Sequence, residues 1–467
     1  MTFNLVDPAD APKAIPLRLV GKAQLEAVLA SLPARERAIL QASGFDAAAG
    51  SVRLMHGEDG AVSAVVAGIG ASILSQAEHD LWAIASLPTA LPQGVYRLAD
   101  EPSADTATLL ALGWALGTYA FETFKKQARR NASLVWPEHA DRGRVVREAE
   151  ALTLARDLIN TPANLLGPVA LAEKAKAMAE QHGANVTVTV GNALLEQNYP
   201  LVYHVGRAAV EEPRLVDIRW GEESHPRVTL VGKGVIFDTG GLDLKPPASM
   251  KIMKKDMGGA AAITALAHMV MAAKLPVRLR VLLPIVENAI SHEAFRPLDV
   301  LPSRNGMTIE IGNTDAEGRL ILADALTEAD SEKPALLINM ATLTGNARVA
   351  FGPELPTLFT RHDDLAAEIA RHSVERADPL WRMPLWPHYR KQLDSKVAHM
   401  NNVSDSAFAG AIIAGLFLAE FVSDETRWAH LDMSGWNFGS RPGRPEGGDA
   451  QAIRALYGVI EDMAAKG

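Results

Sequence analysis

The densest group of potentially reactive side chains lies in a short loop between a predicted strand and a predicted helix. Residues 313–320 read Asn-Thr-Asp-Ala-Glu-Gly-Arg-Leu, which places Asp315, Glu317 and Arg319 within five consecutive positions. Residues two apart in extended backbone point to the same face, so we expect the two carboxylates to converge on one point. Converging carboxylates can hold a metal ion or move protons, whereas the simplest alternative is a solvated polar turn.

Two further segments place charged side chains next to predicted strands. A buried-type strand at 227–231 continues into a glycine-containing loop that carries Lys233 and Asp238. Its spacing matches neither the phosphate-binding P-loop nor the dinucleotide fingerprint, so the glycines do not indicate a nucleotide. Lys245 comes next, and Asp256 stands just before a very apolar helix predicted over 259–273. An alternative for Asp256 is that its side chain only caps this helix.

Carboxylates and cations together make these loops a candidate metal site. The carboxylates are Asp238, Asp256, Asp315 and Glu317, and the cations are Lys233, Lys245 and Arg319. Four carboxylates in one pocket would repel one another unless cations lay among them, and two divalent metal ions bridged by carboxylates would resolve this. Ligand hardness alone favours Mg²⁺ or Mn²⁺.

Other kinds of site find little support in the composition. The chain has no cysteine, which excludes disulfides, thiolate metal sites and a cysteine nucleophile. Its 13 histidines show no zinc-protease spacing such as His-Glu-x-x-His. His430, in the sequence Trp-Ala-His-Leu-Asp, is the histidine with the strongest claim to a role, although a buried structural histidine is the simpler interpretation.

The elements that must position these loops indicate an α/β fold. Predicted strands alternate with helical patterns along the second part of the chain, at 185–190, 215–220, 227–231, 278–284 and 335–340. This alternation predicts a mostly parallel central sheet flanked by helices, and such sheets place their chemistry at the carboxyl ends of strands. We therefore expect a larger C-terminal catalytic domain over residues 141–467.

Residues 1–140 are predicted to form a smaller N-terminal α/β domain without a catalytic constellation. A long helix is predicted over 103–126, closing in the basic residues Lys125, Lys126, Arg129 and Arg130. Such a cluster could contact nucleic acid, but the simpler interpretation is that it offsets the helix dipole. Residues 131–141 read as a linker.

Charge and hydropathy narrow the choice of partners and compartment. The formal net charge of −9 over 467 residues provides no basic field that would attract nucleic acid. The first residues lack a secretory signal, and the most apolar late segment, 410–422, is shorter than the roughly 20 residues of a membrane span. We therefore expect a cytoplasmic protein with no membrane partner.

Several of these segments together resemble a known family. In order and spacing, GKGVIFDTGG (232–241), LKP (244–246), KKDMGGAA (254–261), NTDAEGRL (313–320) and ATLTG (341–345) resemble the leucyl aminopeptidase family, which are two-metal cytosol aminopeptidases of the M17 type. NTPAN (160–164) and WAHLD (428–432) are similar to landmarks of its catalytic domain, so the resemblance covers about residues 150 to 450.

The resemblance implies a role for each matching residue. Five would bind two zinc or manganese ions: Lys233, Asp238, Asp256, Asp315 and Glu317. Asp238 and Glu317 would bridge the ions, Lys245 would polarise the scissile carbonyl, and Arg319 would hold a bicarbonate that serves as general base. Met253, Thr342 and Leu343 match substrate-binding positions, with ordinary core packing as the alternative for Met253.

The function implied is removal of an N-terminal residue, preferably leucine or another apolar one, from peptides by a homohexamer. Alternatives within the family are a dipeptidase-like or cysteinylglycine-type peptidase. A two-metal phosphoryl hydrolase and a nucleic-acid-binding regulator are the alternatives outside that activity. Ile236, Thr239 and the segment 199–207 depart from the common family pattern, and the N-terminal domain shows no recognisable motif.

Overall fold

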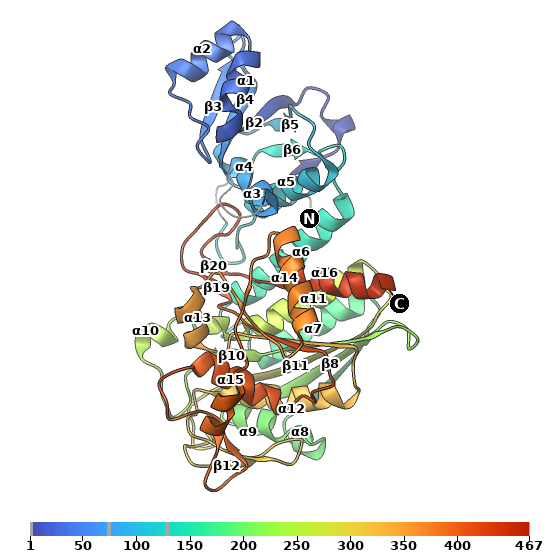
Figure 1. Cartoon of the computed structure of the whole chain (residues 1–467), viewed down its shortest axis with the longest axis vertical. Helices are drawn as coiled ribbons and strands as arrows, with labels where there is room; N and C mark the ends of the chain where they lie inside the picture. The colour runs from blue at the N-terminus through green and yellow to red at the C-terminus, as the bar shows by residue number, and fades with distance from the viewer. Residues whose placement is uncertain (1–2, 72–75, 127–130, 467) are drawn as a thin grey trace. The chain divides into compact units, whose positions relative to one another are not determined.

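The computed structural model describes residues 3–71, 76–126 and 131–466, and the chain divides into two units (Figure 1). Unit 1 contains Met1–Thr153 and Gly439–Glu446, and unit 2 contains Leu154–Phe438 and Gly447–Gly467. The predicted boundary after residue 140 lies before helix α6 (Arg142–Asn160), whereas the units divide inside that helix. A continuous helix pattern carries no break at the point where its packing partners change, so this division could not be predicted from the sequence.

Unit 1 is built on a six-stranded sheet that is parallel except at one edge. In order across the sheet, the strands are β1 (Leu5–Val6), β6 (Ser133–Val135), β5 (Val95–Leu98), β2 (Ile15–Gly21), β4 (Val62–Gly70) and β3 (Val52–His56). Among the described strands of this sheet, only β3 pairs antiparallel, with β4. The helices of this unit are α1 (Leu25–Ser31), α2 (Ala34–Ala42), α3 (Gln76–Ala83), α4 (Leu87–Ala90) and α5 (Ala104–Gly117). The predicted small α/β domain is therefore present.

Two predictions in unit 1 are wrong. The long helix predicted over 103–126 begins as expected, with the Ser103 side chain accepting from the Thr106 amide, but α5 ends at Gly117. At Gly117 the helix passes so close to the preceding turn that a Cβ would lie 2.2 Å from the Ala85 carbonyl oxygen. Beyond this point Lys125 and Lys126 lie outside any helix, and Arg129 and Arg130 fall outside the described residues, so the dipole interpretation fails for the first pair.

The predicted linker at 131–141 was also incorrect, because it contains strand β6. This strand pairs in parallel with both β1 and β5. Three residues are too short for a periodic signal, and only pairing with neighbours on both sides identifies them as a strand.

Unit 2 is built on a larger sheet with a parallel centre and antiparallel margins. Its nine described strands include, in order, β16 (Trp381–Arg382), β15 (Thr357–Phe359), β18 (Trp428–Asp432), β14 (Leu336–Ala341), β9 (Arg227–Gly232), β11 (Arg278–Asn288), β8 (Arg214–Trp220) and β7 (Asn185–Val190), while β10 (Gly234–Asp238) pairs with β11. The contacts β18–β14, β14–β9 and β9–β11 are all parallel. The antiparallel contacts are β15–β18, β11–β8 and β8–β7. The predicted mostly parallel central sheet is thus confirmed at its centre.

Helices cover both faces of this sheet (Figure 1). One layer contains α7 (Pro168–Gln181), α11 (Gly258–Ala272), α14 (Asp363–Glu375) and α16 (Ile453–Lys466), and the other contains α9 (Pro200–Gly206), α12 (Glu317–Ser331) and α15 (Gly410–Ala419). Helix α11 is buried along nearly its whole length, as its apolar sequence predicted. Its start approaches β14 so closely that a Cβ on Gly259 would lie 2.2 Å from the Met340 carbonyl oxygen. None of the described helices is both long and apolar enough to cross a membrane.

Candidate active site

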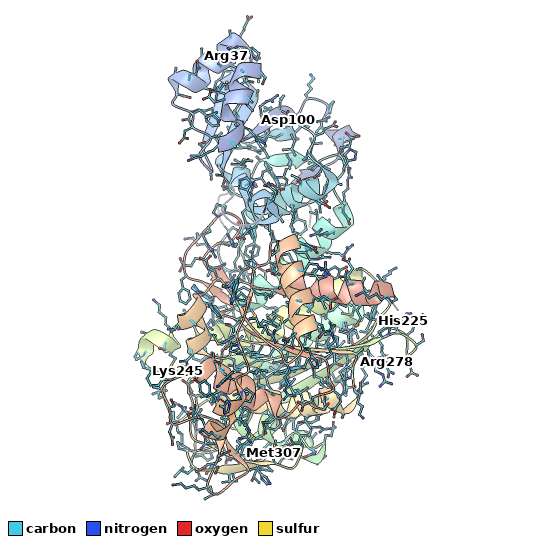
Figure 2. The ribbon with its side chains drawn as sticks, viewed as in Figure 1. Arg37, Asp100, His225, Lys245, Arg278 and Met307 are labelled. Atoms are coloured by element: carbon cyan, nitrogen blue, oxygen red, sulfur yellow. The ribbon has the colours of Figure 1, made fainter. Side chains whose placement is uncertain are left out.

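The candidate site lies at the carboxyl ends of the parallel strands of unit 2. Lys233 follows β9, Asp238 ends β10, and Thr342 follows β14. Lys245 comes from the loop between β10 and α10 (Pro247–Met250) and is labelled in Figure 2. A cavity of about 240 Å³ opens among these chain segments.

All ten residues predicted from the sequence line this one cavity. They are Lys233, Asp238, Lys245, Met253, Asp256, Asp315, Glu317, Arg319, Thr342 and Leu343. They come from segments up to about a hundred positions apart in the sequence, so their meeting is a property of the sheet rather than of any single motif.

Three carboxylates converge at the centre of the cavity. Asp238, Asp315 and Glu317 each offer an oxygen within 4.8 Å of the other two. The expected convergence of Asp315 and Glu317 is therefore present, but its predicted cause was wrong. The chain is not extended here, because Ala316 has φ −122° and ψ 41° and Glu317 is already the first residue of α12.

Two lysines pair with these carboxylates. Lys233 Nζ lies 2.7 Å from Asp256 Oδ2 and 3.0 Å from Glu317 Oε1. Lys245 Nζ lies 2.7 Å from Asp238 Oδ2 and also contacts Asp315. Only glycine at position 318 leaves room for the Lys233 side chain, since a Cβ there would lie 2.4 Å from Lys233 Cε.

Burial and mutual repulsion shift the proton affinities of the carboxylates. Burial, together with the negative charge of Asp238, raises the pKa of Glu317 to about 8 and that of Asp315 to about 7. Both pKa values are raised because the nearby lysines do not fully offset burial and the repulsion between the carboxylates. A set of oxygen ligands that is short of positive charge fits a divalent cation.

The lysines and Asp256 are shifted in the opposite sense. Burial alone would lower the pKa of Lys233, but attraction to Asp256, Glu317 and Asp238 outweighs it and raises the pKa. For Asp256, burial would raise the pKa, but Lys233 and the other nearby lysines outweigh this and lower it. With protein groups alone, the Lys233–Asp256 contact is therefore an ion pair.

Asp256 is held by the cavity rather than by the helix that follows. Its Oδ1 accepts a hydrogen bond from Thr342 Oγ1 at 2.8 Å, while Oδ2 faces Lys233. Helix α11 begins at Gly258, its N-cap residue is Met257, and no described side chain forms a capping hydrogen bond there. The helix-cap alternative for Asp256 is therefore wrong.

Arg319 lines the cavity and is buried, and one N–H group of its guanidinium has no hydrogen-bond partner among the described residues. One nitrogen donates to the Asn402 carbonyl oxygen at 2.6 Å, and the guanidinium carbon lies 6.0 Å from the centre of the Phe417 ring. Its Nε is buried and has no hydrogen-bond partner in the described part of the chain. Burial lowers the pKa of Arg319 to about 10. A buried cation with a spare donor fits a small oxyanion.

The structure adds residues that the sequence did not single out. Asn288, the last residue of β11, donates to Asp238 Oδ1 at 2.8 Å and to the Thr314 carbonyl oxygen at 3.2 Å, which fixes the central carboxylates. The apolar run that continues past the predicted end of this strand at 284 was the available signal. Asn402 bridges the motif loop by donating to the Asn313 carbonyl oxygen at 2.7 Å, and no local pattern marks it. Lys255 and Arg348 also line the cavity.

His430 lies in the core of the sheet, outside the cavity lining. Its Nδ1 is 2.8 Å from the Asn339 amide nitrogen, and its ring stacks on Phe359 with 5.8 Å between centroids. Burial lowers the pKa of His430 to about 3. The structural interpretation of this histidine is the one that the geometry favours.

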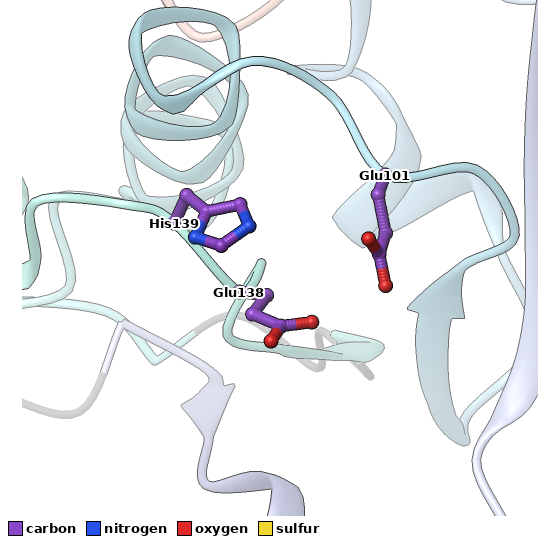
Figure 3. A group of neighbouring side chains, drawn as sticks. All are labelled: Glu101, Glu138 and His139. Atoms are coloured by element: carbon purple, nitrogen blue, oxygen red, sulfur yellow. The ribbon is translucent and has the colours of Figure 1, made fainter.

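Unit 1 contains a second group of potential metal ligands, shown in Figure 3. Glu101, Glu138 and His139 bring ligand atoms within 4.8 Å of one another. All three residues are exposed, and the structure gives them no shared cation or hydrogen-bond donor among the described residues. Exposed groups of this kind remain hydrated, so proximity alone does not make a site.

Comparison with known proteins settles the family. Residues 153–457 match the catalytic-domain profile of the cytosol aminopeptidase family. The chain belongs to the cytosol aminopeptidase family. Residues 15–137 match the N-terminal domain of M17 aminopeptidases, which the sequence motifs had not revealed. Membership identifies the chain as a metal-dependent aminopeptidase, and it removes the phosphoryl-hydrolase alternative.

Individual family members show how far the likeness extends. The "Probable cytosol aminopeptidase" of Mycobacterium ulcerans (strain Agy99) is 40% identical over 395 residues, covering 80% of this chain and 76% of the relative. The crystal structure of the cytosol aminopeptidase from Coxiella burnetii is 44% identical with a TM-score of 0.91, covering 96% of this chain and 97% of that one. The bottromycin maturation enzyme BotP in complex with Mn is 34% identical with a TM-score of 0.86, covering 96% and 99%.

Proposed function

We propose that this chain removes N-terminal leucine or another apolar residue from peptides at a two-metal centre. The observation that supports this most directly is the convergence of Asp238, Asp315 and Glu317 within 4.8 Å in the cavity that also contains Lys233 and Asp256. When bound there, two divalent ions would supply an anchor for the free α-amine and an activated water.

Each protein ligand has a separate task in this proposal. As the family resemblance implies, Asp238 and Glu317 would be the ligands shared by the two ions, and Asp315 and Asp256 would complete the ligand set. Lys233 would have to coordinate as a neutral amine. Two cations beside it would favour that form, because they replace the ammonium as the partner of the carboxylates.

We propose zinc or manganese as the metals. An amine among oxygen ligands suits these borderline ions better than Mg²⁺, which prefers oxygen alone and retains its water. BotP, a structural relative, has been determined in complex with Mn. Ligand hardness alone allows Mg²⁺ as well as Mn²⁺, and the lysine ligand narrows this choice of metal toward Mn²⁺ and Zn²⁺.

Lys245 and Arg319 would act on the reacting groups. Lys245 Nζ reaches Asp238 and Asp315 from the cavity wall, where it can donate to the scissile carbonyl oxygen and stabilise the negative charge that develops there. Arg319 would hold a bicarbonate through its spare donors, and this anion would accept the proton of the attacking water.

The remaining proposals concern the substrate pocket and the oligomeric state. Three residues that line the cavity would contact the first side chain of the peptide: Met253, Thr342 and Leu343. The flexible thioether of Met253 can adapt to first side chains of different shapes. Dipeptides and cysteinylglycine remain the alternative substrates of the same site. By analogy with the family, we propose that the protein is a cytoplasmic homohexamer. We also propose that it acts on peptides rather than on nucleic acid, which the acidic net charge of −9 supports.

Hydrolysis of a leucine anilide tests the proposal. Activity should disappear after dialysis against a chelator and return when Mn²⁺ or Zn²⁺ is added, with the metal content measured by mass spectrometry at each stage. A panel of anilides would rank the first residue. Activity that persists in protein shown to contain no metal would overturn the two-metal mechanism.

A further inference from the structure

Two cations in the active-site cavity have no task in the proposed mechanism. Lys255 belongs to the short helix η3 (Met253–Met257) and is only 6% exposed. Arg348 belongs to α13 (Gly345–Phe351) and is half-buried. Both line the same cavity as the carboxylate cluster.

Lys255 and Arg348 differ from Lys233 and Lys245 in their contacts with carboxylates. Lys233 and Lys245 each contact two carboxylates. In the described part of the chain, the Lys255 ammonium forms no hydrogen bond or ion pair, and the Arg348 guanidinium contacts only the Phe438 ring, at 5.6 Å from its centre. Asp256 and Asp432 attract the Lys255 ammonium only from beyond ion-pair distance, and Arg348 repels it. Positive charge without a contacting carboxylate is costly when it is buried, so the two groups are prepared for an anion that arrives from outside.

The position of the pair indicates which part of a substrate it would meet. Lys255 lies two residues after Met253, and Arg348 lies on the helix that begins directly after the loop with Thr342 and Leu343. These are the chain segments proposed to contact the first side chain. Lys245, which is proposed to contact the scissile carbonyl, instead pairs with Asp238 and Asp315.

We propose that Lys255 and Arg348 form a subsite for a carboxylate at the end of the substrate's first side chain, so that the enzyme also accepts N-terminal glutamate and aspartate. This inference rests on the proposed aminopeptidase function and names a second substrate class for the same cavity. The planar guanidinium supplies paired donors that match a carboxylate, and the ammonium adds a point charge. Apolar first residues would use Met253 and Leu343 without engaging the two cations.

Glutamate and glutamine anilides provide the sharpest test, since they have nearly the same shape and differ in charge. The native enzyme should hydrolyse the glutamate anilide with a kcat/KM about tenfold higher than that of the glutamine anilide, mainly through a lower KM, because hydrogen bonds to charged groups are the stronger ones. Arg348→Met should remove this preference while leaving turnover of glutamine and leucine anilides within about twofold, and Arg348→Lys should retain part of it.

Matched variants and a binding measurement separate the subsite from general damage. Arg296→Met removes an exposed arginine outside the cavity and should change nothing. Lys255→Met should act in the same direction as Arg348→Met, with circular dichroism used to verify that each variant is folded. Inhibition of leucine anilide hydrolysis by free glutamate should exceed that by free glutamine in the native enzyme and not in Arg348→Met.

A second pair of substrates determines which carboxylate is recognised. Leucyl-glycine and leucyl-glycinamide differ only in a carboxylate beyond the scissile bond, and Arg348→Met should leave their ratio unchanged. If that ratio falls while the glutamate preference does not, or if the native enzyme shows no glutamate preference, the subsite is not the one proposed. Absence of leucine anilide hydrolysis in the native, metal-loaded enzyme would instead contradict the aminopeptidase proposal itself.

Discussion

Two clusters in this chain each bring three metal-ligating atoms within 4.8 Å of one another. Asp238, Asp315 and Glu317 lie in a cavity of unit 2 and are paired with lysines, whereas Glu101, Glu138 and His139 are exposed in unit 1 (Figure 3). Buried carboxylates are stable in their charged form only when cations lie nearby. The raised pKa of Glu317 shows that the protein groups alone do not provide enough positive charge. The second cluster is exposed, so its charges can remain hydrated and need no bound cation. Enclosure, rather than the proximity of carboxylates, is what distinguishes the proposed metal site from the exposed cluster.

The largest effect is expected from removing a charge in the enclosed cluster. Asp315→Asn keeps the shape of the side chain but removes one ligand charge, so the protein should remain folded while metal content falls and kcat/KM for a leucine anilide drops about a thousandfold or more. Metal content by mass spectrometry and a thermal melt would be measured on the same sample. Normal turnover with normal metal content would exclude Asp315 from the centre.

The next largest effect is expected at Lys245. Lys245→Met removes the donor to the developing oxyanion and should lower kcat by between about 100- and 1,000-fold, with metal content retained. Its partners Asp238 and Asp315 keep their places through the metals in this proposal. A change confined to KM would show that Lys245 binds substrate and does not stabilise the transition state.

Arg319 should have a smaller effect on catalysis. Arg319→Ala should reduce kcat by about 100-fold while the metals stay bound, and added bicarbonate should no longer stimulate the reaction. The substitution also leaves the Asn402 carbonyl oxygen without its donor, so a melting curve is the necessary control. Loss of metal in this variant would mean that Arg319 supports the fold of the site and not its chemistry.

Enclosure also predicts a pH effect on stability at His430. Burial lowers the pKa of His430 from 6.5 to about 3, so its contribution to folding is complete above pH 6.5 and is lost as the pH falls below that value. At pH 5 the loss amounts to about 2 kcal/mol relative to pH 7. His430→Gln should therefore show a smaller difference in unfolding free energy between pH 7 and pH 5 than the native protein. An equal difference in both proteins would assign the acid sensitivity to other groups.

The exposed cluster should show the smallest effect. Glu138→Gln should leave tightly bound metal, leucine anilide turnover and melting temperature unchanged, because exposed charges contribute little. The variant is the matched control for Asp315→Asn, since each removes one carboxylate charge from a three-ligand group. A loss of bound metal in Glu138→Gln would break the distinction between the two clusters.

The sequence predicted much of the site because its chemistry is concentrated in short segments. The charged residues of the two motifs and of the preceding loop were identified from their types and from the family resemblance. They are Lys233, Asp238, Lys245, Asp256, Asp315, Glu317 and Arg319, and all seven line one cavity. Partners with no local pattern, such as Asn402, could not be identified in this way. Helix α5 is a similar case, because it ends at Gly117, beside the Ala85 carbonyl oxygen, although residues 118–126 contain no proline that would predict this end.

The sequence by itself determined which side chains are available, five strands of the larger sheet (β7, β8, β9, β11 and β14) and the family. Tertiary structure decided how Asp315 and Glu317 meet, through a bend at Ala316 and a helix start rather than through an extended strand. It also placed Lys255 and Arg348 in the cavity, where neither forms an ion pair with a described carboxylate. The physical reason is that residue types act locally, whereas burial and convergence depend on which strand ends lie side by side.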